Sequence, residues 1–370
     1  MKRISWIAGW LLIGLYAWVL SGCELLSERS EPGPAPVAAV LVANQGNFSD
    51  ANGSITVYDP SSGTTVQDAI PNLGSIVQSL AIHDGKGYIM ANSANRVDVF
   101  NVKTLQRTGQ IQNVTSPRYM IFHGDEQAFV TNLFKENFAG GKVTVLDVTR
   151  DQVVTEIEVG NNPEGITEAS GRIYVANHGF GSGNTLSVLH PQTFAVIDTV
   201  VVDCDGPRFL LTDEEEEVWV FCTGQNIYDE NWNLVAQTPG KVLVLAGATG
   251  QEIKQFELNE QLGAVGPGQD AFYAPEAQRI VAVSGNRILQ FDTQANTRLE
   301  TLTLQEDGTM GIGAVAYDGT SDRLYVGWVT GFTTAGWVGI YTPDGTRVGR
   351  FQAGIAPTYI VFRRDQDDHV

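Results

Sequence analysis

The chain has 370 residues, of which 42 are Asp or Glu and 23 are Lys or Arg, so its formal net charge is −19. Because no basic residues are clustered to neutralise phosphates, we expect no nucleic-acid partner. The acidic residues are spread over many turns, with one dense run at residues 214–217, which is typical of a solvated surface.

The first 23 residues differ in composition from the rest of the chain. Lys2 and Arg3 precede an uncharged apolar run at residues 4–20, and Ser21-Gly22-Cys23 follows it, as in a signal peptide. Because the segment ends in Cys, it resembles the bacterial lipobox, in which the Cys thiol is acylated. We therefore predict a lipoprotein signal peptide at residues 1–22, lipidation of Cys23 and a Ser-, Glu- and Pro-rich tether at residues 23–36. The alternative is an uncleaved membrane anchor, for which the apolar run would be short.

A short apolar run that ends in a small residue and Asn recurs through the rest of the chain. It is clear at four places and weaker at three more: residues 40–44, 88–92, 129–132, 173–177, 218–222, 280–284 and 324–328. Repeats of this length, built from short strands and turn residues, indicate a β-propeller. We therefore predict an all-β fold at residues 37–370, a seven-bladed β-propeller with four strands in each blade.

The alternation of apolar residues and the turn residues between them place four strands in each repeat. In the third blade we expect strands at residues 118–122, 128–132, 142–147 and 153–159, and in the fourth at 164–167, 172–177, 185–189 and 195–202. Residues 356–362 match the first strand of a blade, whereas the N-terminal part begins with the second-strand phrase at 40–44. The chain ends should thus share one blade and close the ring, which removes a free sheet edge.

The cysteines and histidines give no catalytic or metal-binding pattern. Cys204 and Cys222 lie at the same end of a predicted hairpin, so a disulfide is feasible in an exported protein, although the spacing does not force it. The five His lack the spacing of a metal site, and no catalytic motif stands in the required strand–helix context. We expect no metal, no cofactor and no catalytic residue, and hence a protein that is not an enzyme.

The strand order divides the connections between two faces of the propeller. One face carries short turns, whereas the other, termed the long-loop face, carries loops at residues 45–53, 133–141, 178–184, 223–240 and 329–336. Binding residues concentrate on variable loops held by a rigid scaffold, so we predict the site here. The loops of this face carry aromatic residues together with Asn side chains such as Asn44 and Asn177, and this combination suits a bulky ligand or a protein partner. The alternative is that each aromatic ring folds back and packs against its own blade. The aromatic candidates are Phe48, Phe134, Phe138, Phe180, Tyr228, Trp232, Trp328, Phe332 and Trp337.

A second set of candidates is a polar ring at the start of the first strands: Gln78, Arg118, Glu164, Arg208, Gln269 and Thr358. Such mixed polar and charged side chains would orient a ligand over the central channel. Alternatively, they pair with one another, Arg118 or Arg208 with Glu164, and satisfy the channel from within. Both interpretations remain open at the level of sequence.

Several phrases resemble known propellers. Residues 173–177, Ile-Tyr-Val-Ala-Asn, are similar to the signature of YVTN or YncE-like propellers, and this likeness runs through all seven repeats. Residues 40–48, 79–92 and 115–119 resemble the surface lipoprotein propellers of Bacteroidota that include the BtuG family, which captures cobalamin and passes it to an outer-membrane transporter. One departure is Gln45, where that family often has Glu. These motifs mark the scaffold and assign no ligand-binding residue.

The resemblance implies a monomeric lipoprotein that is anchored in the outer membrane by its lipid, at the cell surface or on the periplasmic side. It also implies that the long-loop face captures a corrinoid, with cobalamin as the leading candidate, for hand-over to a TonB-dependent transporter. The alternative is an adhesion or scaffold propeller that binds a protein or glycan through the same face. A propeller hydrolase of the lactonase kind would require a carboxylate–metal cluster that the sequence does not assemble.

Overall fold

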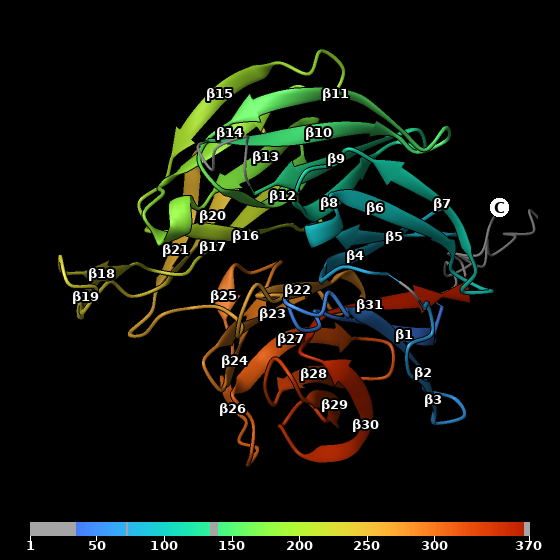
Figure 1. The fold of residues 1–370 in the computed structure, drawn as a ribbon. Coiled ribbons are helices and arrows are strands. Elements are labelled where there is room, and N and C mark those ends of the chain that lie inside the picture. The colour runs from blue at the N-terminus through green and yellow to red at the C-terminus, as the bar shows by residue number, and fades with distance from the viewer. Residues whose placement is uncertain (1–34, 72, 134–139, 366–370) are drawn as a thin grey trace, which may run out of the picture. The chain divides into compact units, whose positions relative to one another are not determined.

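The computed structural model describes residues 35–71, 73–133 and 140–365, and these ranges consist mainly of β-strands. Seven antiparallel sheets are arranged as the blades of a propeller (Figure 1), and one further two-stranded sheet is inserted in the fifth blade. This confirms the predicted fold class. The predicted signal peptide, Cys23 and the aromatic candidates Phe134 and Phe138 lie outside the described residues.

Each blade is numbered by its place along the chain, and its first strand is the innermost. Blade 2 contains β4 (Val77–His83), β5 (Lys86–Ala91), β6 (Arg96–Asn101) and β7 (Arg107–Gln112). Blade 3 contains β8 (Pro117–His123), β9 (Gln127–Asn132), β10 (Gly141–Asp147) and β11 (Gln152–Val159). Blade 4 contains β12 (Pro163–Ala169), β13 (Arg172–Asn177), β14 (Thr185–Leu189) and β15 (Val196–Val201). Strand boundaries in blades 3 and 4 agree with the sequence prediction to within two residues.

Blades 5 to 7 follow the same plan with two irregularities. Blade 5 contains β16 (Pro207–Thr212), β17 (Glu217–Cys222), β20 (Lys241–Ala246) and β21 (Glu252–Glu257), and it inserts a separate hairpin of β18 (Asn226–Tyr228) and β19 (Leu234–Gln237). Blade 6 contains β22 (Ala271–Ala274), β23 (Arg279–Ser284) and β24 (Arg287–Asp292), with β25 (Thr297–Arg298) and β26 (Leu302–Thr303) both pairing with β24. Blade 7 contains β27 (Gly311–Asp318), β28 (Arg323–Val329), β29 (Ala335–Tyr341) and β30 (Arg347–Ile355).

Helical structure is limited to short 3-10 turns in the described part of the chain: η1 (Asn92–Ala94), η3 (Gly179–Gly181) and η4 (Pro275–Ala277). Within the same ranges, no helix has the length and apolar character needed to cross a membrane. The connections between strands are therefore turns and loops. η3 belongs to one of the long loops, and it becomes important for the candidate site.

Blade 1 is assembled from both ends of the propeller sequence. Its first strand is β31 (Pro357–Arg364), which is followed by β1 (Val37–Asn44), β2 (Ser54–Asp59) and β3 (Thr64–Val66). β31 and β1 run antiparallel, with Ile360 opposite Val42, and both side chains are fully buried. In Figure 1 the red β31 lies beside the blue β1. The ring is therefore closed as predicted, and the inner edge of β1 is not left unpaired.

The second strands form the most deeply buried layer, because neighbouring strands flank them and neighbouring blades cover their faces. In β13 every residue after the first is buried, whereas β15 at the outside of the same blade is largely exposed. Phe129, Tyr174 and Trp219, all on second strands, have no more than 1% of their surface exposed. The recurrent apolar phrase thus supplies the contacts between blades.

The Asn that ends the phrase connects the second strand to its surroundings. Asn177 Nδ2 donates to Thr185 Oγ1 on the third strand at 3.0 Å. Asn44 Nδ2 similarly donates to Thr56 Oγ1 on β2 at 3.0 Å, and its Oδ1 accepts the N–H of Gly354, near the end of β30, at 2.9 Å. Because Asn44 and Asn177 are buried, they stabilise the scaffold. This corrects their assignment to an amide surface on the long-loop face.

In blade 5 the phrase ends in Cys222, and the corresponding connection is covalent. Cys222 forms a disulfide with Cys204, with the two sulfurs 1.99 Å apart. Cys204 lies three residues before β16, the position that Gly160 holds before β12, where an added Cβ would collide with the Asn177 side chain. The disulfide therefore replaces the amide contact that joins crossover and second strand in other blades.

Candidate functional site

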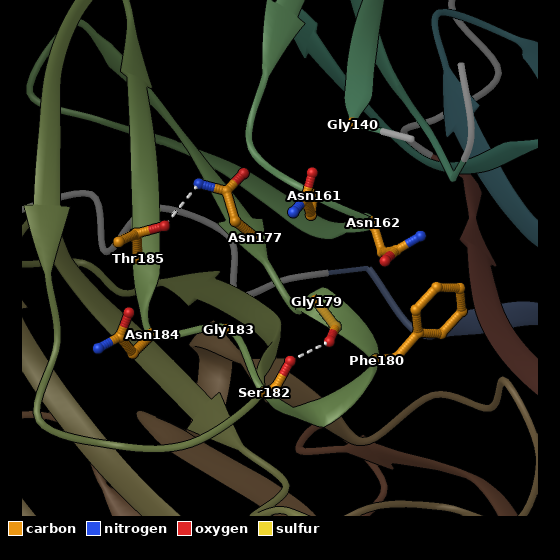
Figure 2. Close-up of a pocket in the computed structure, with 10 residues that line it drawn as sticks. All are labelled: Gly140, Asn161, Asn162, Asn177, Gly179, Phe180, Ser182, Gly183, Asn184 and Thr185. Atoms are coloured by element: carbon orange, nitrogen blue, oxygen red, sulfur yellow. Dashed lines mark hydrogen bonds between the residues drawn. The ribbon is translucent and has the colours of Figure 1, made fainter. Parts of the chain in front are cut away.

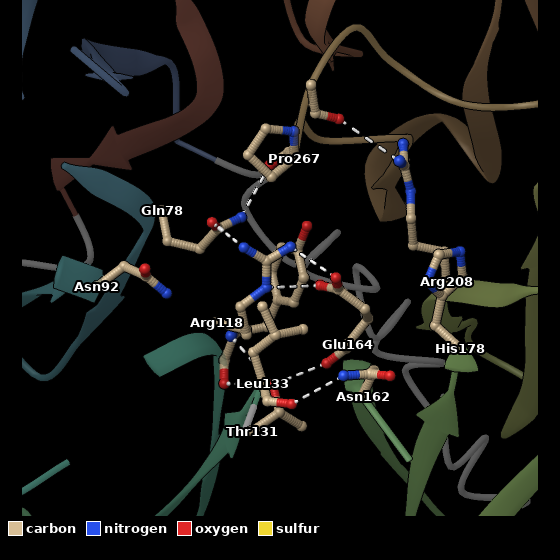
Figure 3. Close-up of polar contacts among 12 residues, drawn as sticks. Gln78, Asn92, Arg118, Thr131, Leu133, Asn162, Glu164, His178, Arg208 and Pro267 are labelled. Atoms are coloured by element: carbon tan, nitrogen blue, oxygen red, sulfur yellow. Dashed lines mark hydrogen bonds and ion pairs between the residues drawn. The ribbon is translucent and has the colours of Figure 1, made fainter. Parts of the chain in front are cut away.

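Four charged side chains of alternating sign lie at the inner ends of blades 3 to 6: Arg118, Glu164, Arg208 and Asp270, termed the charge quartet. Arg118 Nε donates to Glu164 Oε2 at 2.8 Å and its Nη2 to Oε1 at 2.6 Å (Figure 3). Arg208 forms a second bidentate pair with Asp270, in which Nε lies 2.5 Å from Oδ2. Arg118 and Glu164 are 7% and 5% exposed, and Asp270 is fully buried. The quartet thus places two ion pairs inside the protein.

Each carboxylate compensates the burial of the arginine that it faces. Burial alone would lower the pKa of Arg118 and Arg208, because desolvation disfavours the charged form. Glu164 outweighs this effect at Arg118, and Asp270 outweighs it at Arg208, so the pKa of both guanidinium groups is raised. Removing one partner would leave a buried charge uncompensated, which is strongly destabilising.

The partners in the quartet differ in part from those predicted. The sequence suggested that Arg118 or Arg208 pairs with Glu164, and Arg118 does so. Arg208 instead pairs with Asp270. Asp270 escaped the sequence analysis because the alignment of first strands places the adjacent Gln269 in the polar ring. The carboxyl group directly before β22 was the signal that could have identified it.

The crossover from blade 5 to blade 6, residues 258–270, lies over the polar ring and is termed the covering loop. Gln78 Nε2 donates to the carbonyl of Pro267 at 2.8 Å (Figure 3), and the Tyr119 hydroxyl donates to that of Gly268 at 3.2 Å. The Gln269 side chain bonds to the backbone of β31 through both its nitrogen and its oxygen. Through these contacts the covering loop is attached to blades 1, 2 and 3.

Most of the predicted polar ring is therefore structural. Gln78, Gln269 and Thr358 have no more than 3% of their surface exposed, and Arg118 and Glu164 bond to each other. Gln78, Arg118, Glu164 and Gln269 thus bond to groups within the channel, which is the second of the two interpretations that the sequence allowed. The buried hydroxyl of Thr358 has no hydrogen-bond partner among the described residues. Arg208 differs, because 15% of its side chain remains exposed and it lines a cavity on the long-loop face.

Three of the predicted aromatic residues belong wholly or partly to the packed interior. Trp328 is 1% exposed, donates from Nε1 to the Tyr341 hydroxyl at 2.9 Å and stacks on Trp337 at 5.8 Å between ring centroids. It occupies the phrase-ending position, which is buried in every other blade except blade 2, where Asn92 is half-buried, so its assignment to a ligand surface was wrong. Trp337 and Phe332 are half-buried.

The remaining described candidates project from the surface. Phe180 is 68% exposed and has a left-handed backbone conformation with φ of 55° within η3. Tyr228, on β18, is 49% exposed, and Trp232, in the turn between β18 and β19, is 83% exposed. The rings of Tyr228 and Trp232 lie 6.3 Å apart between centroids. Aromatic groups that are this exposed on a folded protein are candidates for contact with a ligand or partner.

Two cavities share Phe180 as a common wall. The first, termed the Tyr228 cavity, has a volume of about 490 Å³ and is lined by His178, Arg208, Tyr228 and part of the covering loop among others. The second, termed the Asn161 cavity, has a volume of about 420 Å³ and is shown in Figure 2. The structure thus brings the predicted candidates Phe180, Arg208 and Tyr228 together around one hollow, on the predicted face.

His178 supplies a neutral imidazole to the Tyr228 cavity. Burial and the nearby positive charge of Arg208 together lower its pKa to about 3, although Asp270 acts in the opposite direction. Its Nε2 lies 3.3 Å from Thr223 Oγ1. At neutral pH this side chain is therefore a hydrogen-bonding group without charge. The sequence analysis passed over it because a single His on a loop carries little information.

A third cavity, of about 500 Å³, lies in the channel on the other side of the polar ring. Its walls come from the first strands and include Leu211, Tyr359 and Val361. These residues follow the polar ring along the same strands, where the apolar side chains of the channel begin. The covering loop and the charge quartet therefore separate this apolar space from the long-loop face.

Comparisons with known proteins identify the fold. No protein-family model matches the chain, and no curated protein matches its sequence. Among solved structures, periplasmic gluconolactonase from Pseudomonas aeruginosa matches with a TM-score of 0.67 at 12% identity, over 88% of this chain and 98% of that one. Hydrazine synthase from Kuenenia stuttgartiensis matches with a TM-score of 0.62 at 17% identity, over 83% and 99%.

A protein of unknown function from Desulfotomaculum acetoxidans also matches, with a TM-score of 0.66 at 11% identity, over 88% of this chain and 99% of that one. At such low identity these likenesses establish the fold alone. Within the described residues, no three His, Cys, Asp or Glu side chains are grouped so as to hold a metal ion. The chain therefore shares the seven-bladed β-propeller fold with two enzymes and with a protein of unknown function.

We expect the Arg118–Glu164 pair to be essential for stability. Arg118→Met or Glu164→Leu alone should lower the free energy of unfolding by about 3–5 kcal/mol, because each leaves a buried charge without its partner. The double variant should lose less than either single variant, because neither charge remains. Urea unfolding followed by tryptophan fluorescence measures these differences.

Arg150→Met provides the control, because Arg150 is 71% exposed and pairs with Asp147 at the surface. This variant should unfold almost as the parent does. If the two single variants at Arg118 and Glu164 also unfolded like the parent, the charge quartet would not be the stabilising element that its burial indicates.

Proposed function

We propose that the protein captures a bulky, amide-bearing small molecule on its long-loop face, in the Tyr228 cavity, with a corrinoid as the leading candidate. The observation that carries this proposal is the convergence of Phe180, Tyr228 and Arg208 on one cavity of about 490 Å³. That volume lies in the range of about 300–1,000 Å³ that is usual for small-molecule sites. Aromatic walls with a few polar groups are also typical of such sites.

The composition of the cavity suits a macrocycle with amide side arms. The exposed rings of Phe180 and Tyr228 offer apolar faces to a flat ligand. Asn226 and Gln261 also line the cavity, and Gln261 Nε2 donates to Asn226 Oδ1 at 3.0 Å, which leaves the amide hydrogens of Asn226 for a ligand. His178 adds an uncharged imidazole, because its pKa is lowered to about 3. A neutral, amide-rich ligand would therefore find complementary groups on every side.

Preorganisation also supports a binding role. Arg208 holds Asp270 in a bidentate ion pair, and Asp270 is the last residue of the covering loop, which forms one wall of the cavity. Because this wall is fixed before a ligand arrives, binding requires little additional ordering of the loop. Arg208 thus acts mainly as a positioning residue for the wall of the site.

The resemblance to BtuG-like lipoproteins supports the identity of the ligand and the place of the protein in the cell. On this proposal, Cys23 carries the lipid that anchors the chain in the outer membrane, and the protein passes cobalamin to a TonB-dependent transporter. Replacing Cys23 with Ser should shift the protein from the membrane fraction to the soluble fraction, because the acyl chains provide the attachment. A variant that stayed in the membrane fraction as strongly as the wild type would contradict lipidation at this residue.

The β18–β19 hairpin supports a second candidate, a scaffold protein that docks a macromolecular partner. Its apolar side chains Ile227, Tyr228, Trp232, Leu234 and Val235 are 39% to 83% exposed. Exposed aromatic groups in such clusters are typical centres of protein interfaces. Tyr228 belongs to both the hairpin and the cavity, so the two candidate functions meet at one residue.

The turn that carries Trp232 has a fixed structure. Asp229 accepts hydrogen bonds from the backbone N–H groups of Asn231 at 2.9 Å and Asn233 at 2.8 Å. The N–H of Trp232 donates to the Asp229 carbonyl at 3.0 Å. These bonds hold the indole in a projecting position without any contribution from a ligand, which is the arrangement expected of an anchor for a partner surface.

Calorimetric and spectroscopic titration with cyanocobalamin separates the two functions. We expect micromolar or tighter binding by the wild type and a loss of about tenfold or more in Tyr228→Ala, since a central aromatic contact commonly contributes ~2 kcal/mol. Phe48→Ala is the matched control, because Phe48 is 73% exposed on another loop of the same face and lines neither cavity. The absence of both heat and spectral change at micromolar protein would reject the corrinoid and favour the docking function.

A further inference from the structure

We propose that the Asn161 cavity is a separate site for a neutral saccharide, with Phe180 as the surface on which the sugar ring stacks. The cavity of about 420 Å³ is shown in Figure 2, and it shares Phe180 with the Tyr228 cavity. This assignment does not depend on whether the Tyr228 cavity binds a corrinoid, because the Asn161 cavity has its own set of polar groups. Four observations lead to this assignment: the presentation of Phe180, the amides around it, the charge of the lining and the size of the space.

Phe180 is presented in an unfavourable conformation by a rigid loop. Its φ of 55° is costly for a residue with a bulky side chain. The loop is fixed by hydrogen bonds from the N–H of Gly181 and of Gly183 to the carbonyl of His178, each at 3.0 Å. The Ser182 hydroxyl closes the turn by donating to the Gly179 carbonyl at 2.7 Å. The ring nevertheless remains 68% exposed, so the strained conformation is not explained by burial in the core.

The loop also depends on a close approach between backbones. An added Cβ on Gly183 would lie 1.9 Å from the carbonyl oxygen of Asn177, which closes this position to any other residue. The second strand β13 ends at Asn177, and every residue of β13 after the first is buried, so the loop begins directly from the packed interior. Phe180 is therefore held at a fixed place relative to the scaffold, as a stacking surface must be.

Two amides at the cavity have free hydrogen-bonding capacity. The side chains of Asn161 and Asn184 are exposed and form no hydrogen bond with other described residues. The amide of Asn177, by contrast, is used within the scaffold, where it bonds to Thr185. Each free amide offers two donor hydrogens and one acceptor oxygen, and this is the complement of a pair of sugar hydroxyls.

Among the described residues, the lining of the cavity has no ionisable group, although the chain as a whole has a net charge of −19. These described lining residues are Asn, Ser, Thr and Gly residues together with Phe180. They offer no cation to a phosphate or carboxylate ligand and no carboxylate to an ammonium ligand. The matching ligand is a neutral molecule with one apolar face and a rim of hydroxyl groups, because the face packs on an aromatic ring and the rim bonds to amides. A pyranose ring has this combination.

Direct titration with neutral sugars tests the assignment. The probes are glucose, galactose, mannose and N-acetylglucosamine, together with their β-linked disaccharides, and binding is followed by ligand-observed NMR and calorimetry. We expect at least one probe to bind with a dissociation constant of about 1 mM or tighter. Phe180→Ala should weaken that binding by at least tenfold, and Asn161→Ala and Asn184→Ala by about fivefold each, which corresponds to one lost hydrogen bond.

Two control variants make the site specific. Phe48→Ala removes an exposed ring from a different loop, and Tyr228→Ala alters the corrinoid cavity alone, so both should bind the sugar as the wild type does. Because Phe180, Asn161 and Asn184 are exposed, their variants should keep the parent's melting temperature, and the two Asn variants test the site even if Phe180→Ala folds poorly. Failure of the corrinoid titration would leave this result unaffected.

Three outcomes would overturn the proposal. One is that no probe binds at concentrations up to about 10 mM, where even weak sugar sites are occupied. Another is that a sugar binds equally well to the wild type and to the Asn161 and Asn184 variants. The last is that Tyr228→Ala abolishes sugar binding while Asn184→Ala does not, which would place the sugar in the Tyr228 cavity.

Discussion

The charge quartet is the constraint on which the rest of the candidate site depends. One bidentate ion pair joins the inner ends of blades 3 and 4, and a second joins those of blades 5 and 6. Because Asp270 is the last residue of the covering loop, its pairing with Arg208 also fixes that loop over the channel. The loop in turn forms a wall of the Tyr228 cavity. The pairing of Arg208 with Asp270 therefore also fixes a wall of this cavity, because a buried charge requires its partner.

The architecture could be predicted from the sequence because it rests on local, repeated signals. The apolar phrase marks each second strand, and the turn residues mark the strand ends. The predicted strand boundaries in blades 3 and 4 therefore agree with the structure to within two residues. The likeness of residues 356–362 to other first strands predicted the closure of β31 on β1. The longest interval between phrases, from Cys222 to Ser284, contains the β18–β19 hairpin, whose alternation is too short to distinguish it from a loop.

The site was harder to predict because exposure and pairing are set by distant parts of the chain. Trp328 follows an apolar run at a loop edge, yet the phrase-ending position is buried by the neighbouring blade. Arg118 and Glu164 are 46 residues apart and meet only because adjacent blades bring their first strands together. Phe180 and Tyr228 were identified from loop length and aromatic character, but nothing local showed that they share one cavity. The sequence could predict that these residues lie on the loops of one face, whereas it could not predict how deeply each side chain is buried.

Amide hydrogen exchange with and without cyanocobalamin tests the central claim most directly, namely that the long-loop face holds the ligand above a rigid floor. We expect slower exchange on binding in residues 178–183, 223–228 and 259–266, and no change in the short turns at 84–85 and 320–322. Strands β8 and β12, which carry the Arg118–Glu164 pair, should exchange slowly in both states. Protection confined to the short turns, or rapid exchange in β8 and β12 without ligand, would contradict this claim.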